Sequence, residues 1–249
     1  MTTLITGASS GLGAEMARQL ARRDHDLALC ARRTDRLRLL RDELLAAHPG
    51  LRVEIRALDV NDHDAVFAVF RDFAETLGHV DRVVVNAGIG KGAPLGTGRF
   101  DVNRETAMTN LVAALAQVEA AMEVFRAQGG GHLVMVSSMS AIRGLPKTMT
   151  TYAATKAGVA HLVEGLRAEF YGQDTYRFTV LYPGYIASEM NDGPAAAQNT
   201  MMVSTEKGVA AMVSAIEKER ASACVPPLPW APLSVVMRYA PLPVFRRLI

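Results

Sequence analysis

The sequence has no block of charge of one sign and no long apolar run, and it contains only two cysteines. Its 249 residues include 27 basic and 25 acidic ones, so the formal net charge is only +2. The basic patch of a nucleic-acid-binding protein is missing, and we expect no nucleic-acid partner. No uninterrupted apolar run reaches the roughly 18 residues that a membrane-spanning helix needs. The first strand pattern begins too early to leave room for a signal peptide, so we expect a cytoplasmic protein.

The two cysteines, Cys30 and Cys224, lie in apolar surroundings and lack the spacing of metal ligands. Disulfides are rare in reducing compartments, so we predict two buried thiols and no metal site. The chain also lacks internal repeats and any linker between domains. Its length and its hydrophobic content of 49% suit a substantial core. We therefore expect a single domain over residues 1–249.

Short apolar strands alternate with amphipathic helices along most of the chain. The predicted strands cover residues 3–6, 27–31, 53–58, 82–85, 133–136, 178–182 and 223–225. The predicted helices cover residues 14–22, 35–47, 62–77, 100–128, about 152–171 and 206–218. This alternation predicts an α/β fold, doubly wound, with a parallel sheet of about seven strands and helices on both faces. Ligands bind beyond the carboxyl ends of the strands in such a sheet.

A glycine-rich turn joins the first predicted strand to the first helix. It consists of Gly7, Ala8, Ser9, Ser10, Gly11, Leu12 and Gly13. Glycines allow a pyrophosphate to come close to the backbone, and a helix start offers free N–H groups and the positive end of the helix dipole. The order of strand, turn and helix therefore predicts a dinucleotide phosphate site. The alternative is a merely tight turn, which does not require the entropic cost of three glycines.

Arginines follow the second predicted strand where an acid would bind the ribose of NAD(H). In a dinucleotide fold, an Asp or Glu at this strand end takes the 2′-hydroxyl, whereas an Arg accommodates a 2′-phosphate. Here Ala31 stands at the position of the acid, and Arg32 and Arg33 follow. Because a guanidinium binds phosphate through paired hydrogen bonds, we predict NADP(H) rather than NAD(H). The alternative is two solvated arginines, and this applies more to Arg33 than to Arg32.

Tyr152 and Lys156 are four residues apart in a predicted helix, so their side chains emerge on the same face. A protonated amine beside a phenol favours the phenolate and lowers the tyrosine pKa. Tyr152 is therefore a candidate proton donor. The same spacing also occurs by chance on solvated helix faces.

Taken in order, the motifs of this chain resemble those of the short-chain dehydrogenase/reductases. The matching residues are Thr6-Gly7-x-x-x-Gly11-x-Gly13, Asn86-Ala87-Gly88, Asn110, a serine after the fifth strand, Tyr152-x-x-x-Lys156 and Pro183-Gly184. The resemblance implies a Rossmann-type domain. It also implies an oxidoreductase that transfers a hydride between NADP(H) and a carbonyl or alcohol.

The resemblance implies a role for each of four catalytic residues. Tyr152 would be the acid/base, and Lys156 would hold the nicotinamide ribose and lower the pKa of Tyr152. Ser138 would orient the substrate oxygen, and Asn110 would anchor a water relay behind Lys156. Ser138 precedes Tyr152 by one residue more than the family pattern, so we expect a bulge at residues 147–151. Ser140 stays open as an alternative to Ser138.

The resemblance also implies the cofactor contacts. The turn from Gly7 to Gly13 would hold the pyrophosphate, including Ser9, Ser10, Gly11 and Leu12. Asp59 and Val60 would meet the adenine. Asn86, Ala87 and Gly88 would serve strand packing and the adenosine ribose. After Pro183 and Gly184, the residues Ile186 and Ser188 would meet the nicotinamide carboxamide.

The Pro-rich tail, residues 226–249, is not needed for the sheet. It could form a short amphipathic helix with Trp230 on one face and arginines at the border, which permits contact with a membrane surface. We favour a flap over the substrate cleft or a subunit interface, because prolines interrupt the tail. Met190, Met201 and Met202 suit a lipophilic substrate, although they could equally be ordinary packing.

Two further expectations concern assembly and rival functions. The helices of Asn110 and Tyr152 carry more apolar surface than one sheet face would cover, so we expect a homo-dimer or homo-tetramer. Two alternatives in function stay open: an NAD(H)-preferring dehydrogenase, and a non-catalytic dinucleotide-sensing or membrane-associated module on the same fold.

Overall fold

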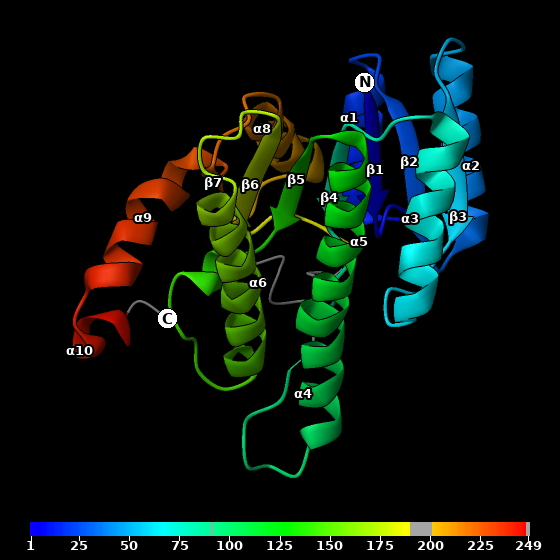
Figure 1. The fold of residues 1–249 in the computed structure, drawn as a ribbon. Helices are drawn as coiled ribbons and strands as arrows, with labels where there is room; N and C mark the ends of the chain where they lie inside the picture. Colours follow the sequence, from blue (N-terminus) through cyan, green and yellow to red (C-terminus); the bar gives the residue numbers. More distant parts are fainter. Residues whose placement is uncertain (91, 190–200, 248–249) are drawn as a thin grey trace.

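Seven parallel strands form one sheet with helices on both faces in a computed structural model that describes residues 1–90, 92–189 and 201–247 (Figure 1). The strand order is β3-β2-β1-β4-β5-β6-β7. The strands are β1 Thr2–Thr6, β2 Asp26–Ala31, β3 Val53–Ala57, β4 Arg82–Val85, β5 Gly131–Val136, β6 Tyr176–Pro183 and β7 Ser222–Val225. The order reverses between β1 and β4, which confirms the predicted doubly wound, Rossmann-type architecture.

The helices lie between the strands as the apolar periodicity predicts. They are α1 Gly11–Ala21, α2 Thr34–Ala47, α3 His63–Leu77, α4 Phe100–Ala107, α5 Ala113–Gln128, α6 Met149–Glu169 and α8 Thr205–Glu217, followed by α9 Pro227–Tyr239 and α10 Leu242–Phe245 in the tail. The helix predicted at residues 100–128 is present, but a π-helical segment, Met108–Val112, separates α4 from α5. The sequence pattern does not predict this widened turn, which holds Asn110.

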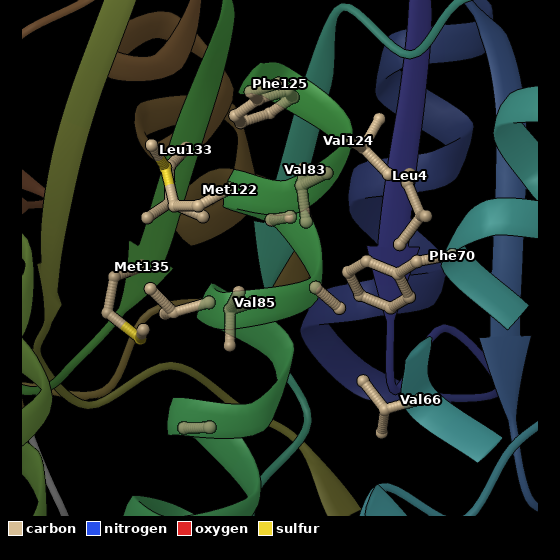
Figure 2. Packing of buried hydrophobic residues seen from close by; sticks show 14 of the residues in the cluster. Leu4, Val66, Phe70, Val83, Val85, Met122, Val124, Phe125, Leu133 and Met135 are labelled. Atoms are coloured by element: carbon tan, nitrogen blue, oxygen red, sulfur yellow. The ribbon is translucent and has the colours of Figure 1, made fainter. Parts of the chain in front are cut away.

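The strands are buried on both faces, which explains their continuous apolar runs. Leu4 and Ile5 are neighbours on β1 with 1% and 0% of their surface exposed, yet they belong to the clusters on opposite faces of the sheet. Figure 2 shows the cluster that contains Leu4, where Phe70 of α3 and Phe125 of α5 pack over the strands. Helices packed on both faces therefore hold the strands, whose carboxyl ends carry the motif residues.

A buried polar network lies at the amino-terminal edge of the sheet, opposite the strand ends that carry the motifs. Arg82 is 2% exposed, and its guanidinium donates from Nε to His132 Nδ1 at 3.1 Å and from Nη1 to Glu217 Oε1 at 2.6 Å. His132 Nε2 lies 2.8 Å from the hydroxyl of Thr179. Because Nδ1 accepts from Arg82, the imidazole is neutral, and burial is the main reason that its pKa falls to about 3.

The free energy of unfolding should therefore fall on acidification. The imidazole of His132 titrates near pH 6.5 in an unfolded chain and near pH 3 in the fold, so protons bind preferentially to the unfolded chain below about pH 6.5. Stability should decrease by up to about 1.4 kcal/mol per pH unit between these limits because of this residue. Urea unfolding from about pH 7 to about pH 4 should show a shallower loss for His132→Gln than for the wild type. His161→Gln, at an exposed position, is the matched control, and equal slopes in all three proteins would contradict the assignment.

Candidate active site

A cleft of about 640 Å³ lies at the carboxyl ends of the strands. It is lined by the loops that follow the strands and by part of the tail. Of the predicted site residues, all line the cleft except Gly13 and Asn110. The structure thus brings together side chains that are spread over most of the chain.

The glycine turn fits a pyrophosphate. A Cβ atom on Gly13 would lie only 2.4 Å from the carbonyl oxygen of Gly7 and 2.8 Å from Nδ2 of Asn86, so a glycine is needed for helix α1 to start directly behind the turn. Asn86 also donates from Nδ2 to the carbonyl of Thr6 at 2.9 Å, which holds the ends of β4 and β1 together. The first turn of α1 contains no acidic residue. An anionic group therefore meets free N–H groups and the positive end of the helix dipole here.

The two arginines after β2 have different surroundings. Arg33 donates to the hydroxyls of Ser9 and Ser10 and to the carboxylate of Glu189, at 3.0 Å from Nη1 to Oε2. Arg32 is exposed at the wall of the cleft and makes no ion pair within the described residues. Arg32 is thus available to a ligand, whereas the guanidinium of Arg33 is already occupied.

Glu189 forms ion pairs with both Arg33 and Arg36, which lie at the start of α2 beside the cleft. Hydrogen bonds from Arg36 and then from Arg33 hold the pKa of the Glu189 carboxyl at about 2, so it is ionised at neutral pH. No motif predicts this residue, and the only signal in the sequence is an acid directly after Ser188. A carboxylate among these arginines occupies part of the positive charge that a phosphate would use.

Lys156 is anchored at the other end of the cleft. Its side chain is buried, with 7% of the residue exposed, and Nζ donates to the carbonyl of Val136 at 3.0 Å. The hydroxyl of Ser137 donates to the carbonyl of Lys156 at 2.7 Å, which joins the same strand and helix a second time. Burial lowers the pKa of the ammonium to about 8, so most of it stays protonated at neutral pH.

Tyr152 lies one turn before Lys156 on α6, with the ring centre 5.9 Å from Nζ. Burial is the largest influence on the phenol and raises its pKa, and a hydrogen bond with Ser138 acts in the opposite direction. Lys156 is not among the groups that shift this pKa. The expected lowering of the pKa by the lysine is therefore not found, because desolvation of the buried phenol outweighs the other influences.

Ser138 is the serine whose hydroxyl acts on the pKa of Tyr152. Its Oγ also accepts from the backbone N–H of Ser140 at 3.2 Å, which caps a short 3₁₀ turn, Met139–Ala141. The Ser140 hydroxyl is buried and makes no hydrogen bond in the part of the chain that the structure describes. Helix α6 begins at Met149, and the irregular backbone lies just before it at Lys147, with φ of 59°. This irregularity lies at the start of residues 147–151, where we expect the bulge.

Asn110 lies behind the wall of the cleft, in the π-helical segment. Its amide makes two hydrogen bonds with the backbone of Ile89, accepting from N–H at 2.8 Å and donating to the carbonyl at 2.7 Å. A Cβ atom on Gly88 would lie 3.1 Å from Asn110 Oδ1 and 3.5 Å from Lys156 Nζ. Asn110, Gly88 and Lys156 are therefore neighbours, and the asparagine holds the strand exit beside the ammonium.

Ile186 and Ser188, the two residues predicted to meet the nicotinamide carboxamide, have different surroundings. The side chain of Ile186 is 1% exposed and packs on helix α8, where a Cβ on Gly208 would lie 2.7 Å from it. Its side chain therefore serves the core. Ser188 lies beside the glycine turn, 3.5 Å from where a Cβ on Gly11 would be. Among the three methionines, Met201 lines the cleft, Met202 does not, and Met190 lies outside the described residues.

The tail forms one wall of the cleft. Its apolar contribution consists of Trp230, Leu233, Met237 and Phe245. The indole of Trp230 lies on Gly184, so close that a Cβ there would be 2.0 Å from the ring. Arg143 also holds the tail in place. It donates hydrogen bonds to the carbonyls of Met237 and Ala240, and its Cζ atom lies 4.5 Å from the ring centre of Phe245. The tail thus lies beside the cleft, which is one of the two positions that we favour from the sequence, whereas the contact of Trp230 with Gly184 has no signal in the composition.

Cys30 and Cys224 do not contribute to the cleft. Cys30 is buried in the sheet, whereas Cys224 on β7 is only half-buried, and both thiols are free. Burial raises the pKa of both thiols, which lowers the fraction of thiolate at neutral pH. No group of three or more His, Cys, Asp and Glu side chains that could hold a metal ion occurs within residues 1–90, 92–189 and 201–247.

The model of the short chain dehydrogenases matches residues 1–199, which is most of the chain. The chain belongs to the short-chain dehydrogenase/reductase family. An uncharacterized oxidoreductase of Mycobacterium tuberculosis is 52% identical over 244 residues, which cover 98% of this chain and 95% of that protein. It follows that this short-chain dehydrogenase/reductase is an oxidoreductase.

Solved structures of the family share the fold. Levodione reductase is 27% identical with a TM-score of 0.80, over 90% of this chain and 93% of that one. An alcohol dehydrogenase from the archaeon Thermococcus sibiricus, complexed with 5-hydroxy-NADP, is also 27% identical, with a TM-score of 0.76 over 90% of this chain and 94% of that one. Short-chain dehydrogenase/reductases bind a nicotinamide dinucleotide and act on small molecules. The glycine turn, the arginine at one end of the cleft and the lysine at the other fit such a ligand.

Replacing Gly184 by alanine should displace the wall that the tail forms. The new Cβ would lie 2.0 to 2.4 Å from atoms of the Trp230 ring, so the indole must leave its position at a cost of about 1–3 kcal/mol in stability. Trp230 is the single tryptophan of the chain, and its fluorescence should shift to longer wavelength as the ring becomes exposed. Gly144→Ala is the matched control, since nothing lies within 4 Å of a Cβ there. Unchanged emission from the Gly184 variant would show that the tail is not seated on this glycine.

Proposed function

We propose that the chain is an NADP(H)-dependent carbonyl reductase or alcohol dehydrogenase that acts on lipophilic substrates. The observation that carries this proposal is that Tyr152 and Ser138 line the same cleft, with Tyr152 one helical turn from the buried ammonium of Lys156. When bound, NADPH supplies the hydride for reduction of the carbonyl.

Tyr152 and Ser138 supply what the substrate oxygen needs. Reduction of a carbonyl develops negative charge on its oxygen, and hydrogen-bond donors aimed at that atom stabilise it. The raised pKa keeps the phenol of Tyr152 protonated at neutral pH, so it can donate a proton to the developing alkoxide. Ser138 orients the same oxygen through its hydroxyl. In the reverse direction the phenolate of Tyr152 accepts the proton of an alcohol.

Lys156 and its neighbours hold the nicotinamide end of the cofactor. An ammonium has three donors, and Nζ of Lys156 uses one of them for the carbonyl of Val136. The remaining N–H groups suit the hydroxyls of the nicotinamide ribose. Asn110 fixes the backbone beside Lys156 through Ile89, and we assign to it the support of a water relay behind the ammonium.

The opposite end of the cleft suits the adenosine of NADP(H). Ala31 leaves the ribose without a carboxylate from β2, and Arg32 has no partner among the described residues that a 2′-phosphate would have to displace. Asp59 and Val60 line the adenine end, and the turn from Gly7 to Gly13 holds the pyrophosphate. The 5-hydroxy-NADP complex of the Thermococcus sibiricus relative supports the preference for a 2′-phosphate.

The part of the tail that lines the cleft suggests the kind of substrate. The wall of Trp230, Leu233, Met237 and Phe245 excludes water and favours an apolar substrate. A screen of NADPH consumption with aldehydes, ketones, quinones, and steroid or fatty-acyl carbonyls will identify the substrate.

Two apolar side chains near the start of the Asn110 helix suggest an interface between subunits. Phe100 on α4 is 72% exposed, and Met108 in the π-helical segment is 40% exposed. With α5 and α6 they would form the interface of a homo-dimer or homo-tetramer, and members of the family commonly oligomerise.

Tyr152→Phe should abolish turnover and leave cofactor binding intact. The substitution removes the proton donor but keeps the ring, so the rate should fall by about 10²- to 10⁴-fold, with the dissociation constant of NADPH changed by less than about twofold. Turnover and fluorescence titration with NADPH measure the two quantities. Tyr171→Phe, on a tyrosine that is 90% exposed just after the same helix, should change neither. Full activity of the Tyr152 variant would refute the proposed acid/base.

Arg32→Ala should weaken ligands that carry a 2′-phosphate. Losing a charged hydrogen-bond donor should raise the dissociation constants of NADPH and 2′,5′-ADP by about tenfold or more. The constants for NADH and 5′-ADP should stay unchanged, because these ligands lack that phosphate. Arg38→Ala on the exposed side of α2 is the matched control. Equal weakening of NADPH and NADH would contradict the preference.

Glu189→Gln should act in the opposite direction. The variant removes the carboxylate that occupies Arg33 and Arg36, so it should tighten 2′,5′-ADP by a few fold and leave 5′-ADP unchanged. Calorimetry at low and high salt measures both, and the gain should shrink as salt screens the charges. Weaker binding of 2′,5′-ADP would show that Glu189 supports the phosphate site instead of competing for it.

A further inference from the structure

The outer face of the tail is apolar and exposed. Figure 1 shows α9 and α10 at one side of the molecule, away from the centre of the sheet. Large apolar side chains of the tail that do not line the cleft are between 44% and 74% exposed. They are Leu228, Val235, Val236, Tyr239, Leu242 and Val244. We call these six residues the outer tail face. Such clustering of apolar groups on a surface marks an interaction site.

The tail itself carries charge of one sign only. Residues 220–247 contain four arginines and no Asp or Glu. Arg238, Arg246 and Arg247 are exposed, and none of them forms an ion pair within the described residues. The nearest acids before this stretch, Glu217 and Glu219, are already paired with Arg82 and Arg177. The partner of this face must therefore accept apolar side chains and supply negative charge.

A second copy of the chain meets only one of these requirements. Two outer tail faces related by a two-fold axis would cover their apolar groups, but the same arginines would face one another across the interface. Like charges brought together in this way oppose association. No helix in the described part of the chain is long and apolar enough to cross a bilayer, so a membrane would be contacted at its surface. Aromatic and aliphatic groups beside arginines are typical of helices that lie in the headgroup region.

We propose that the outer tail face binds the surface of a membrane that contains anionic lipids. Val235, Val236, Tyr239 and Leu242 enter the boundary between headgroups and acyl chains, and Arg238, Arg246 and Arg247 contact the lipid phosphates. Because Arg143 and the seat of Trp230 on Gly184 hold the inner face of the tail, docking does not require the tail to leave the cleft.

Flotation with lipid vesicles tests the proposal directly on the full chain. Vesicles of phosphatidylcholine alone are compared with vesicles of phosphatidylcholine and phosphatidylglycerol, at low and high salt. The wild type should float with the anionic vesicles and not with the neutral ones, and salt should weaken the binding. The variant Leu242→Ser with Arg246→Gln should bind at least about tenfold more weakly, since it loses an apolar and a basic contact together.

A matched variant uses the same changes at a distant site. Leu39→Ser with Arg38→Gln replaces the same residue types on α2, where Leu39 is 71% exposed, against 65% for Leu242. It should bind anionic vesicles as the wild type does, and circular dichroism should show that both variants are folded. Failure of the wild type to float, or equal loss in the two variants, would overturn the proposal. So would a smaller oligomer of the tail variant in light scattering, because the face would then belong to a second copy.

This test is independent of catalysis. Vesicle binding needs neither a substrate nor NADP(H), so a failure of the proposed reductase activity leaves its outcome unchanged. Conversely, if the wild type reduces carbonyls but does not bind anionic vesicles, the proposed activity stands and the proposed membrane contact is refuted.

Discussion

The hydrogen bond from the ammonium of Lys156 to the carbonyl of Val136 positions the reactive corner of this protein. It joins helix α6 to the last residue of β5, and the bond from Ser137 to the carbonyl of Lys156 secures the same junction. Ser138 comes two residues after Val136, and Tyr152 comes one turn before Lys156. The contact between strand and helix therefore also brings the phenol to the serine hydroxyl, and the packing of α6 on the sheet keeps both in place.

The cleft has a different chemical character at each end. Arg32 and the start of α1 provide positive charge near the ends of β1 and β2, whereas burial dominates around Tyr152, whose pKa it raises. The protein thus offers charge where a dinucleotide carries phosphates and a desolvated proton donor where a carbonyl would react. The tail extends this difference to the surface, with an inner face toward the cleft and an outer face toward solvent.

Local patterns in the sequence predict the sheet and the helices. Nearly all of the site residues that the motifs and the family resemblance imply line the cleft, because each motif follows a strand whose end the fold brings to one edge. Three features depend on contacts between distant segments and have no local signal. The π-helical segment at Asn110, the ion pairs of Glu189 with Arg33 and Arg36, and the seat of Trp230 on Gly184 are of this kind. The expected lowering of the Tyr152 pKa by Lys156 failed for a related reason, since spacing along a helix does not reveal how deeply a phenol is buried.

The most direct test of this account is a crystal structure of the protein with NADP⁺ bound. One cofactor should lie along the cleft, with its 2′-phosphate on Arg32, its pyrophosphate on the turn from Gly7 to Gly13 and its nicotinamide ribose on Lys156. The nicotinamide ring should then lie beside Tyr152 and Ser138. A cofactor bound outside this cleft, or one whose 2′-phosphate makes no contact with Arg32, would contradict it.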